Sequence, residues 1–151
     1  MESCRCDLCV SACRRDPGRL VPADIEPLAR LLGLTPAELL ARHLVLRPLP
    51  GPEGGYALAP VKGKAHRLLV DPGTVVPAYY EAEDGWCVFL AEGGECRVHA
   101  AKPFECRAYS GCRNTFLGRP YRRKEVEEYF RKRWRSAQET VRKLREAAAG
   151  R

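Results

Sequence analysis

The hydrophobic positions near the start of the chain follow the period of two short helices. Residues 22–32 combine Pro22 in the first turn with Asp24 and Glu26 at the positive end, and Gly33 provides the stop. Thr35-Pro36-Ala37-Glu38 is a capping-box pattern, so we expect a second helix that runs to about His43. The two predicted helices share an apolar face made of Ile25, Leu28, Leu31, Leu32, Leu39, Leu40 and Leu44.

The middle of the chain has short apolar stretches that are typical of strands. After a Pro/Gly-rich loop at 47–55, strands are expected over 56–61 and 67–70, on either side of Lys62-Gly63-Lys64. Two more strands are expected over 86–90 and 96–99. Gly93-Gly94 lies between these two and favours a hairpin.

The pattern becomes helical again from about residue 122 to 149, with Gly150 as the stop. We therefore predict an α+β fold: a small single domain with two N-terminal helices and a long C-terminal helix around a few short antiparallel strands, with converging cysteine loops. Residues 1–118 would form the body of the domain, which holds all the cysteines, and 119–151 a basic C-terminal helix packed on it. The stripe expected to pack is Val126, Tyr129, Phe130, Trp134, Ala137, Val141, Leu144 and Ala148.

Composition and charge limit the classes of protein. A chain of 151 residues with 45% hydrophobic and 30% charged residues is typical of one globular domain. It has no apolar run long enough to span a membrane and no secretory pattern at its start, so we expect a cytoplasmic protein without a membrane partner. The net charge of +7 lies in residues 119–151, which hold twelve Lys/Arg and five Asp/Glu.

Eight cysteines are the unusual feature of the composition. Thiols are kept reduced in the cytosol, so metal binding or redox chemistry is a better interpretation than a disulfide-rich secreted domain. Thiolates suit Zn²⁺, Cu(I) and iron–sulfur clusters, and eight of them fill two four-ligand sites, or one site with spare thiols. The candidate metal ligands are Cys4, Cys6, Cys9 and Cys13 in a first group, and Cys87, Cys96, Cys106 and Cys112 in a second.

Several neighbours of the cysteines allow more than one interpretation. Arginine directly follows five of the eight, and these guanidinium groups either offset thiolate charge or are ordinary surface residues. His99, three residues after Cys96, is either a ligand, a hydrogen-bond donor to the site, or an ordinary loop histidine. The aromatic residues near cysteines either shield a cluster or belong to the core: Trp86, Phe89, Phe104 and Tyr109.

Two segments resemble the YkgJ-type cysteine-cluster family. The first is Cys6-Asp-Leu-Cys9 with Cys13, followed by the helix pattern up to Glu38. The second and more specific runs from Cys87-Val-Phe-Leu through Gly94-x-Cys96-x-Val98-His99-x-x-Lys-Pro-x-x-Cys106-Arg-x-Tyr109. The resemblance implies a zinc- or iron-chelating domain; relatives include flagellin lysine methylases, but no methyl-donor site is recognisable here.

This chain departs from the family pattern at one position. Ala12 stands where the family has the first of two adjacent cysteines, and Cys4 lies ahead of the usual first cysteine. Cys4 is therefore either a replacement ligand or a spare thiol. We further expect the two cysteine groups to meet in space, because closing a long loop costs little more than closing a medium one.

Two functions follow from these features, and neither decides whether the protein is an enzyme. The first is an iron–sulfur protein with a redox or electron-transfer role and an unidentified redox or protein partner. Crowded thiolates in residues 4–13 favour it, since they are unlike the paired knuckles of zinc sites. The alternative is a structural zinc module that binds a partner, such as nucleic acid, through its basic C-terminal helix.

Overall fold

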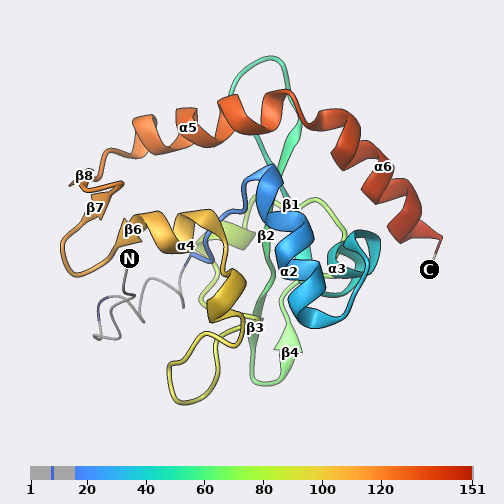
Figure 1. Ribbon diagram of the computed structural model, residues 1–151, viewed down its shortest axis with the longest axis horizontal. Coiled ribbons are helices and arrows are strands. Elements are labelled where there is room, and N and C mark those ends of the chain that lie inside the picture. Colours follow the sequence, from blue (N-terminus) through green and yellow to red (C-terminus); the bar gives the residue numbers. More distant parts are fainter. Residues whose placement is uncertain (1–7, 9–15, 151) are drawn as a thin grey trace.

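The computed structural model describes Leu8 and residues 16–150, and it has the predicted α+β architecture (Figure 1). The first group of cysteines, Cys4, Cys6, Cys9 and Cys13, lies outside the described residues. None of the helices described is long and apolar enough to cross a membrane.

Both N-terminal helices form where the sequence predicts them. The 3₁₀ turn η1 (Pro22–Asp24) leads into α2 (Ile25–Leu32), which ends at Gly33 with a left-handed φ of 69°. Helix α3 (Pro36–His43) begins with a full capping box, in which the Thr35 hydroxyl accepts from the Glu38 amide.

Strand β1 (Leu44–Pro48) was not predicted. Leu44 was expected on the helical face, but it is the first residue of an antiparallel hairpin with β2 (Tyr56–Pro60), in register Leu44 to Pro60. Leu44, Val45 and Leu46 are all buried, as are Ala57 to Pro60. These strands therefore lack the alternation of apolar and polar residues that marks a strand with one exposed face.

The middle strands are shorter than predicted. Lys62-Gly63-Lys64, expected between strands, is itself strand β3, which pairs with β4 (Arg67–Leu68) and β5 (Trp86–Cys87). Residues 96–99 form no strand: Cys96 makes a single antiparallel bridge to Leu90, and the 3₁₀ turn η3 starts at His99. The remaining elements of this half are η2 (Tyr80–Ala82), η3 (His99–Ala101), α4 (Phe104–Ala108), β6 (Tyr109–Ser110), β7 (Thr115–Phe116) and β8 (Arg119–Pro120).

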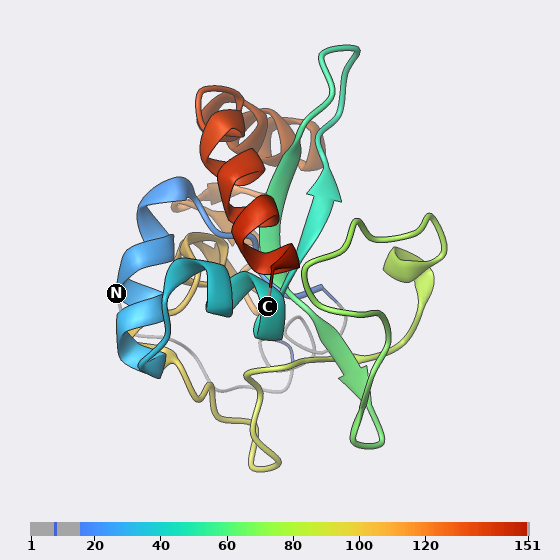
Figure 2. The same ribbon diagram turned by 90° about the vertical axis from the view of Figure 1, so that its right-hand side faces the viewer.

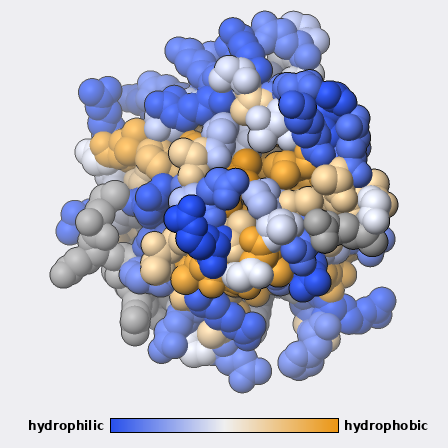
Figure 3. Space-filling model, turned by 45° about the vertical axis from the view of Figure 1, so that its right-hand side comes forward, coloured by the Kyte–Doolittle hydropathy of each residue, from blue (hydrophilic) through white to orange (hydrophobic). Residues whose placement is uncertain are grey.

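The C-terminal segment is helical as predicted, but the prediction of a single long helix is wrong, because the segment forms two helices. Helix α5 (Arg123–Arg135) stops at Ser136, and α6 (Gln138–Ala149) leaves in a new direction to pack on α3 (Figure 2). The Gln138 side chain holds the bend, because its amide bonds both backbone groups of Tyr56 and the carbonyl of Trp134. The exposed surface over these two helices is mostly hydrophilic (Figure 3).

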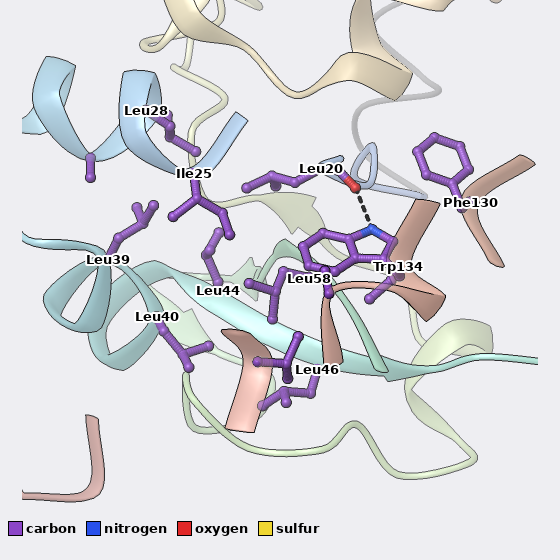
Figure 4. Close-up of a cluster of buried hydrophobic side chains, with 14 of the residues drawn as sticks. Leu20, Ile25, Leu28, Leu39, Leu40, Leu44, Leu46, Leu58, Phe130 and Trp134 are labelled. Atoms are coloured by element: carbon purple, nitrogen blue, oxygen red, sulfur yellow. Dashed lines mark hydrogen bonds between the residues drawn. The ribbon is translucent and has the colours of Figure 1, made fainter. Parts of the chain in front are cut away.

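Trp134 belongs to the main hydrophobic core (Figure 4). It is fully buried, and its indole Nε1–H donates to the Leu20 carbonyl at 2.7 Å. Val126, Phe130, Ala137 and Val141 of the predicted stripe are buried as well. The C-terminal helices therefore complete the core that the rest of the described chain begins.

Truncating Trp134 tests this packing. We expect Trp134→Ala to lower the free energy of unfolding by about 3–5 kcal/mol, as large aromatic truncations in cores do. Chemical denaturation measures the loss, and exposed Lys132→Ala on the same helix should stay within about 0.5 kcal/mol of wild type. A loss below about 1 kcal/mol for Trp134→Ala would contradict the packing.

His43 is the last residue of α3, and its ring lies 5.5 Å from that of Phe89. Its Nδ1 is buried and makes no hydrogen bond to any described residue. Burial, with a smaller contribution from the Arg42 charge, lowers the pKa of His43 below its usual value. The unfolded chain therefore takes up this proton at a higher pH than the folded chain.

The free energy of unfolding should accordingly fall as the pH decreases through about 6.5, because protonation then favours the unfolded state. Replacing the imidazole in His43→Leu removes this contribution, so the loss of stability between about pH 7.5 and 5 should be smaller than in wild type. Denaturant titrations at each pH measure it. If the free energy of unfolding changes equally with pH in the wild type and the variant, the pKa of His43 is the same in the folded and the unfolded chain.

Candidate metal centre

The four described cysteines occupy two neighbouring stretches of the fold. Cys87 ends β5 and Cys96 follows the loop after it, whereas Cys106 lies in α4 and Cys112 follows β6. No disulfide joins any two of these four. A metal site requires cysteines in the thiol or thiolate form, and no bond among these four excludes that form.

Backbone hydrogen bonds fold residues 87–97 into a compact loop. The Leu90 amide donates to the Cys87 carbonyl at 2.9 Å, and the Arg97 amide donates to the Phe89 carbonyl at 2.8 Å. The bridge between Leu90 and Cys96 lies between these two contacts. The loop therefore holds Cys87 and Cys96 at its two ends.

Cys96 is mostly buried, and burial raises the pKa of its thiol, although the Val98 amide and the Lys102 charge oppose this. The thiol is therefore protonated at neutral pH in this structure. Binding a metal there would release its proton, so the apparent affinity would rise with pH.

Buried charge holds helix α4, which carries Cys106, against residues 19–24. The Arg19 guanidinium makes a two-pronged ion pair with Glu105, at 3.0 and 2.9 Å. In addition, the Arg19 amide donates to the Glu105 carboxylate, and the Glu105 amide donates to the Arg19 carbonyl. Asp24 is buried and accepts from the Phe104 amide and from Arg107, each at 2.8 Å. Cys106 is thereby fixed relative to the segment that precedes η1.

Gly18 packs directly on Cys106. A Cβ added at Gly18 would lie 2.4 Å from the Cys106 Sγ and 2.9 Å from its backbone nitrogen, closer than real contacts allow. Only a glycine permits this approach. Gly18 is five residues after Cys13, so the chain that leaves the first cysteine group runs beside a sulfur of the second.

The other sequence candidates have other roles or are not gathered into a site. Among residues 8 and 16–150, no three His, Cys, Asp or Glu side chains lie close enough to hold one metal ion. His99 is exposed on η3. Phe89 is a core residue, and the Arg107 guanidinium is bound to Asp24 and lies over the Phe104 ring at 5.4 Å.

Lys62 is a site neighbour that sequence reasoning missed. It is the cross-strand partner of Cys87, so the two side chains leave the same face of the sheet. It is 1% exposed, and its ammonium donates to the Glu83 carbonyl at 3.0 Å and lies over the Tyr80 ring at 4.7 Å. Burial lowers the pKa of Lys62. Lysine in a short polar stretch is ordinarily exposed, so no signal in the sequence marked it.

No protein-family model matches the chain, and neither the curated proteins nor the solved structures give a match to it. The resemblance to the cysteine-cluster family remains an expectation from the motifs.

The contact between Gly18 and Cys106 can be tested by adding one methyl group. Gly18→Ala should lower the free energy of unfolding by about 1–3 kcal/mol, since the new Cβ overpacks a sulfur and a backbone atom. Thermal and denaturant unfolding measure the effect. Gly93→Ala is the matched control, because its Cβ would meet nothing closer than 3.9 Å. Equal stability of the two variants would contradict the close approach.

Proposed function

We propose that this protein holds an iron–sulfur cluster with cysteines from both groups and uses it for one-electron redox or electron transfer. The observation that carries the proposal is the contact of Gly18 with the Cys106 sulfur. An extended chain covers five residues in at most ~18 Å, so the tether from Gly18 back to Cys13 is short. Chain length therefore allows Cys13 to share a site with Cys106.

The number of ligands that a metal site needs supports a site shared by the two groups of cysteines. Four ligands complete a tetrahedral zinc site or a common iron–sulfur cluster, yet the described residues alone provide no group of three. Thiolates from the first group would complete a site that the second group begins. The donor set consists of soft sulfur ligands, which fits iron–sulfur clusters and zinc alike.

Fixed positive charge also supports an anionic thiolate centre. Lys62 is buried beside the sheet position of Cys87, and the charge of Lys102, also buried, opposes the rise in the thiol pKa of Cys96 that burial causes. A cluster held by thiolates is negative overall, so these cations would favour its binding, and charge near a cluster tunes its reduction potential. The cluster would supply the electron; the chain's residues set how readily it is gained and lost.

Metal analysis of protein purified without oxygen tests the proposal. We expect iron and acid-labile sulfide, a brown colour, broad visible absorption and bleaching by dithionite. Colourless protein with one or two zinc ions per chain and no sulfide would overturn it and establish the structural zinc alternative. Protein without any metal, in which denaturation exposes few titratable thiols, would instead reveal a disulfide-rich domain.

Cysteine variants test which thiols bind the cluster. Cys106→Ser should cut the iron and sulfide content at least about twofold, because a weaker ligand replaces a thiolate next to the first group. Cys4→Ser should do the same if Cys4 replaces the ligand missing at Ala12. Thr140→Ser on exposed α6 is the control and should keep the wild-type content. Unchanged content in Cys106→Ser would exclude Cys106 as a ligand.

A further inference from the structure

The positive charge of the protein is concentrated between α4 and the end of α5. Residues 107–135 contain ten Lys/Arg and three Glu, which gives +7, the net charge of the whole chain. Part of this charge is neutralised within the fold. Arg123 pairs with Glu127, Arg131 with Glu128, and Arg135 with Glu53.

Another part of this charge remains available to a partner. Six cations of the segment are exposed and make no ion pair with any described residue: Arg113, Arg119, Arg122, Lys124, Lys132 and Arg133. Among the three glutamates of residues 107–135, Glu125 is the exposed one, and it makes no ion pair with any described residue. A surface of this kind attracts polyanions.

Aromatic rings add a second, independent feature. Phe104 of α4 and Tyr129 of α5 are stacked, with ring centroids 5.5 Å apart and planes within 6° of parallel. The Arg133 guanidinium lies over the Tyr129 ring, with its Cζ 3.3 Å from the centroid. The stack therefore ends in a planar, exposed cation whose outer face can receive another flat ring.

Two of the available cations lie at the opposite end of α5 from Arg133, in the β7–β8 hairpin and directly before the helix. Arg119 is the cross-strand partner of Phe116, whose ring meets that of Tyr129 edge-on at 5.4 Å. Arg122 immediately precedes α5, seven residues before Tyr129. The β7–β8 hairpin and the start of α5 lie together at one end of the molecule (Figure 1).

We propose that α5 and the β7–β8 hairpin bind single-stranded nucleic acid, with a base stacked on Arg133 near the end of α5 and the backbone phosphates bound by Arg119 and Arg122 at its start. Stacking platforms combined with basic side chains are how proteins bind single strands without reading sequence. A duplex buries its base faces in its own stack, so it would engage only the phosphate contacts. This inference goes beyond the proposed redox function and does not depend on which metal is bound.

Fluorescence anisotropy with a labelled single-stranded oligonucleotide and the matching duplex tests it, using the protein as purified without oxygen. We expect the single strand to bind more tightly than the duplex. Arg119→Glu/Arg122→Glu should weaken single-strand binding at least about tenfold and reduce the slope of log K against log salt by about 1.4, or about 0.7 for each lost phosphate contact. Arg30→Glu/Arg67→Glu changes the net charge equally at exposed positions elsewhere and should cost less than about threefold.

Arg133→Lys separates stacking from charge, because it keeps the charge and removes the planar group. We expect at least about fivefold weaker binding to the single strand, and an unchanged affinity for the duplex. Absence of binding, equal losses in both double variants, a duplex bound as tightly as the single strand, or full affinity in Arg133→Lys would each overturn the proposal.

Discussion

The burial of Trp134 against the backbone of Leu20 is the contact on which the described arrangement depends. The indole belongs to the core, and its N–H satisfies a carbonyl in a segment that has no regular secondary structure. A buried carbonyl without a partner costs about 1–3 kcal/mol. One side chain of α5 therefore both packs the core and fixes the course of the chain before η1.

That segment in turn positions α4. Arg19 directly precedes Leu20, and its guanidinium pairs with Glu105 of α4. Asp24, at the end of η1, accepts a hydrogen bond from the Phe104 amide in the first turn of α4. A five-residue helix has little stability of its own. The ion pairs and the close approach of Gly18 give Cys106 a fixed place, which a ligand of a metal centre needs.

The buried charged residues and the exposed ones have different roles in this structure. Buried groups such as Asp24 and Lys62 are hydrogen-bonded within the fold, where they position backbone and neighbour the cysteines. The arginines from 107 onward are mostly exposed, and Arg133 lies over the ring of Tyr129. The proposed thiolate centre and the proposed nucleic-acid surface thus use different groups of one small fold.

The sequence by itself determined the fold class, the two N-terminal helices and the apolar stripe around Trp134, because capping residues and the 3.6-residue period are local signals. It also singled out the cysteines. Only the tertiary structure decided that β1 is a strand, that the C-terminal helix bends at Ser136, and that Gly18 lies on Cys106. The bend depends on Gln138 reaching Tyr56, and α4 depends on Arg19 and Asp24, partners about 80 residues away. Contacts at that separation leave no periodic trace in the chain, since they are selected by packing and by the cost of unpaired buried groups.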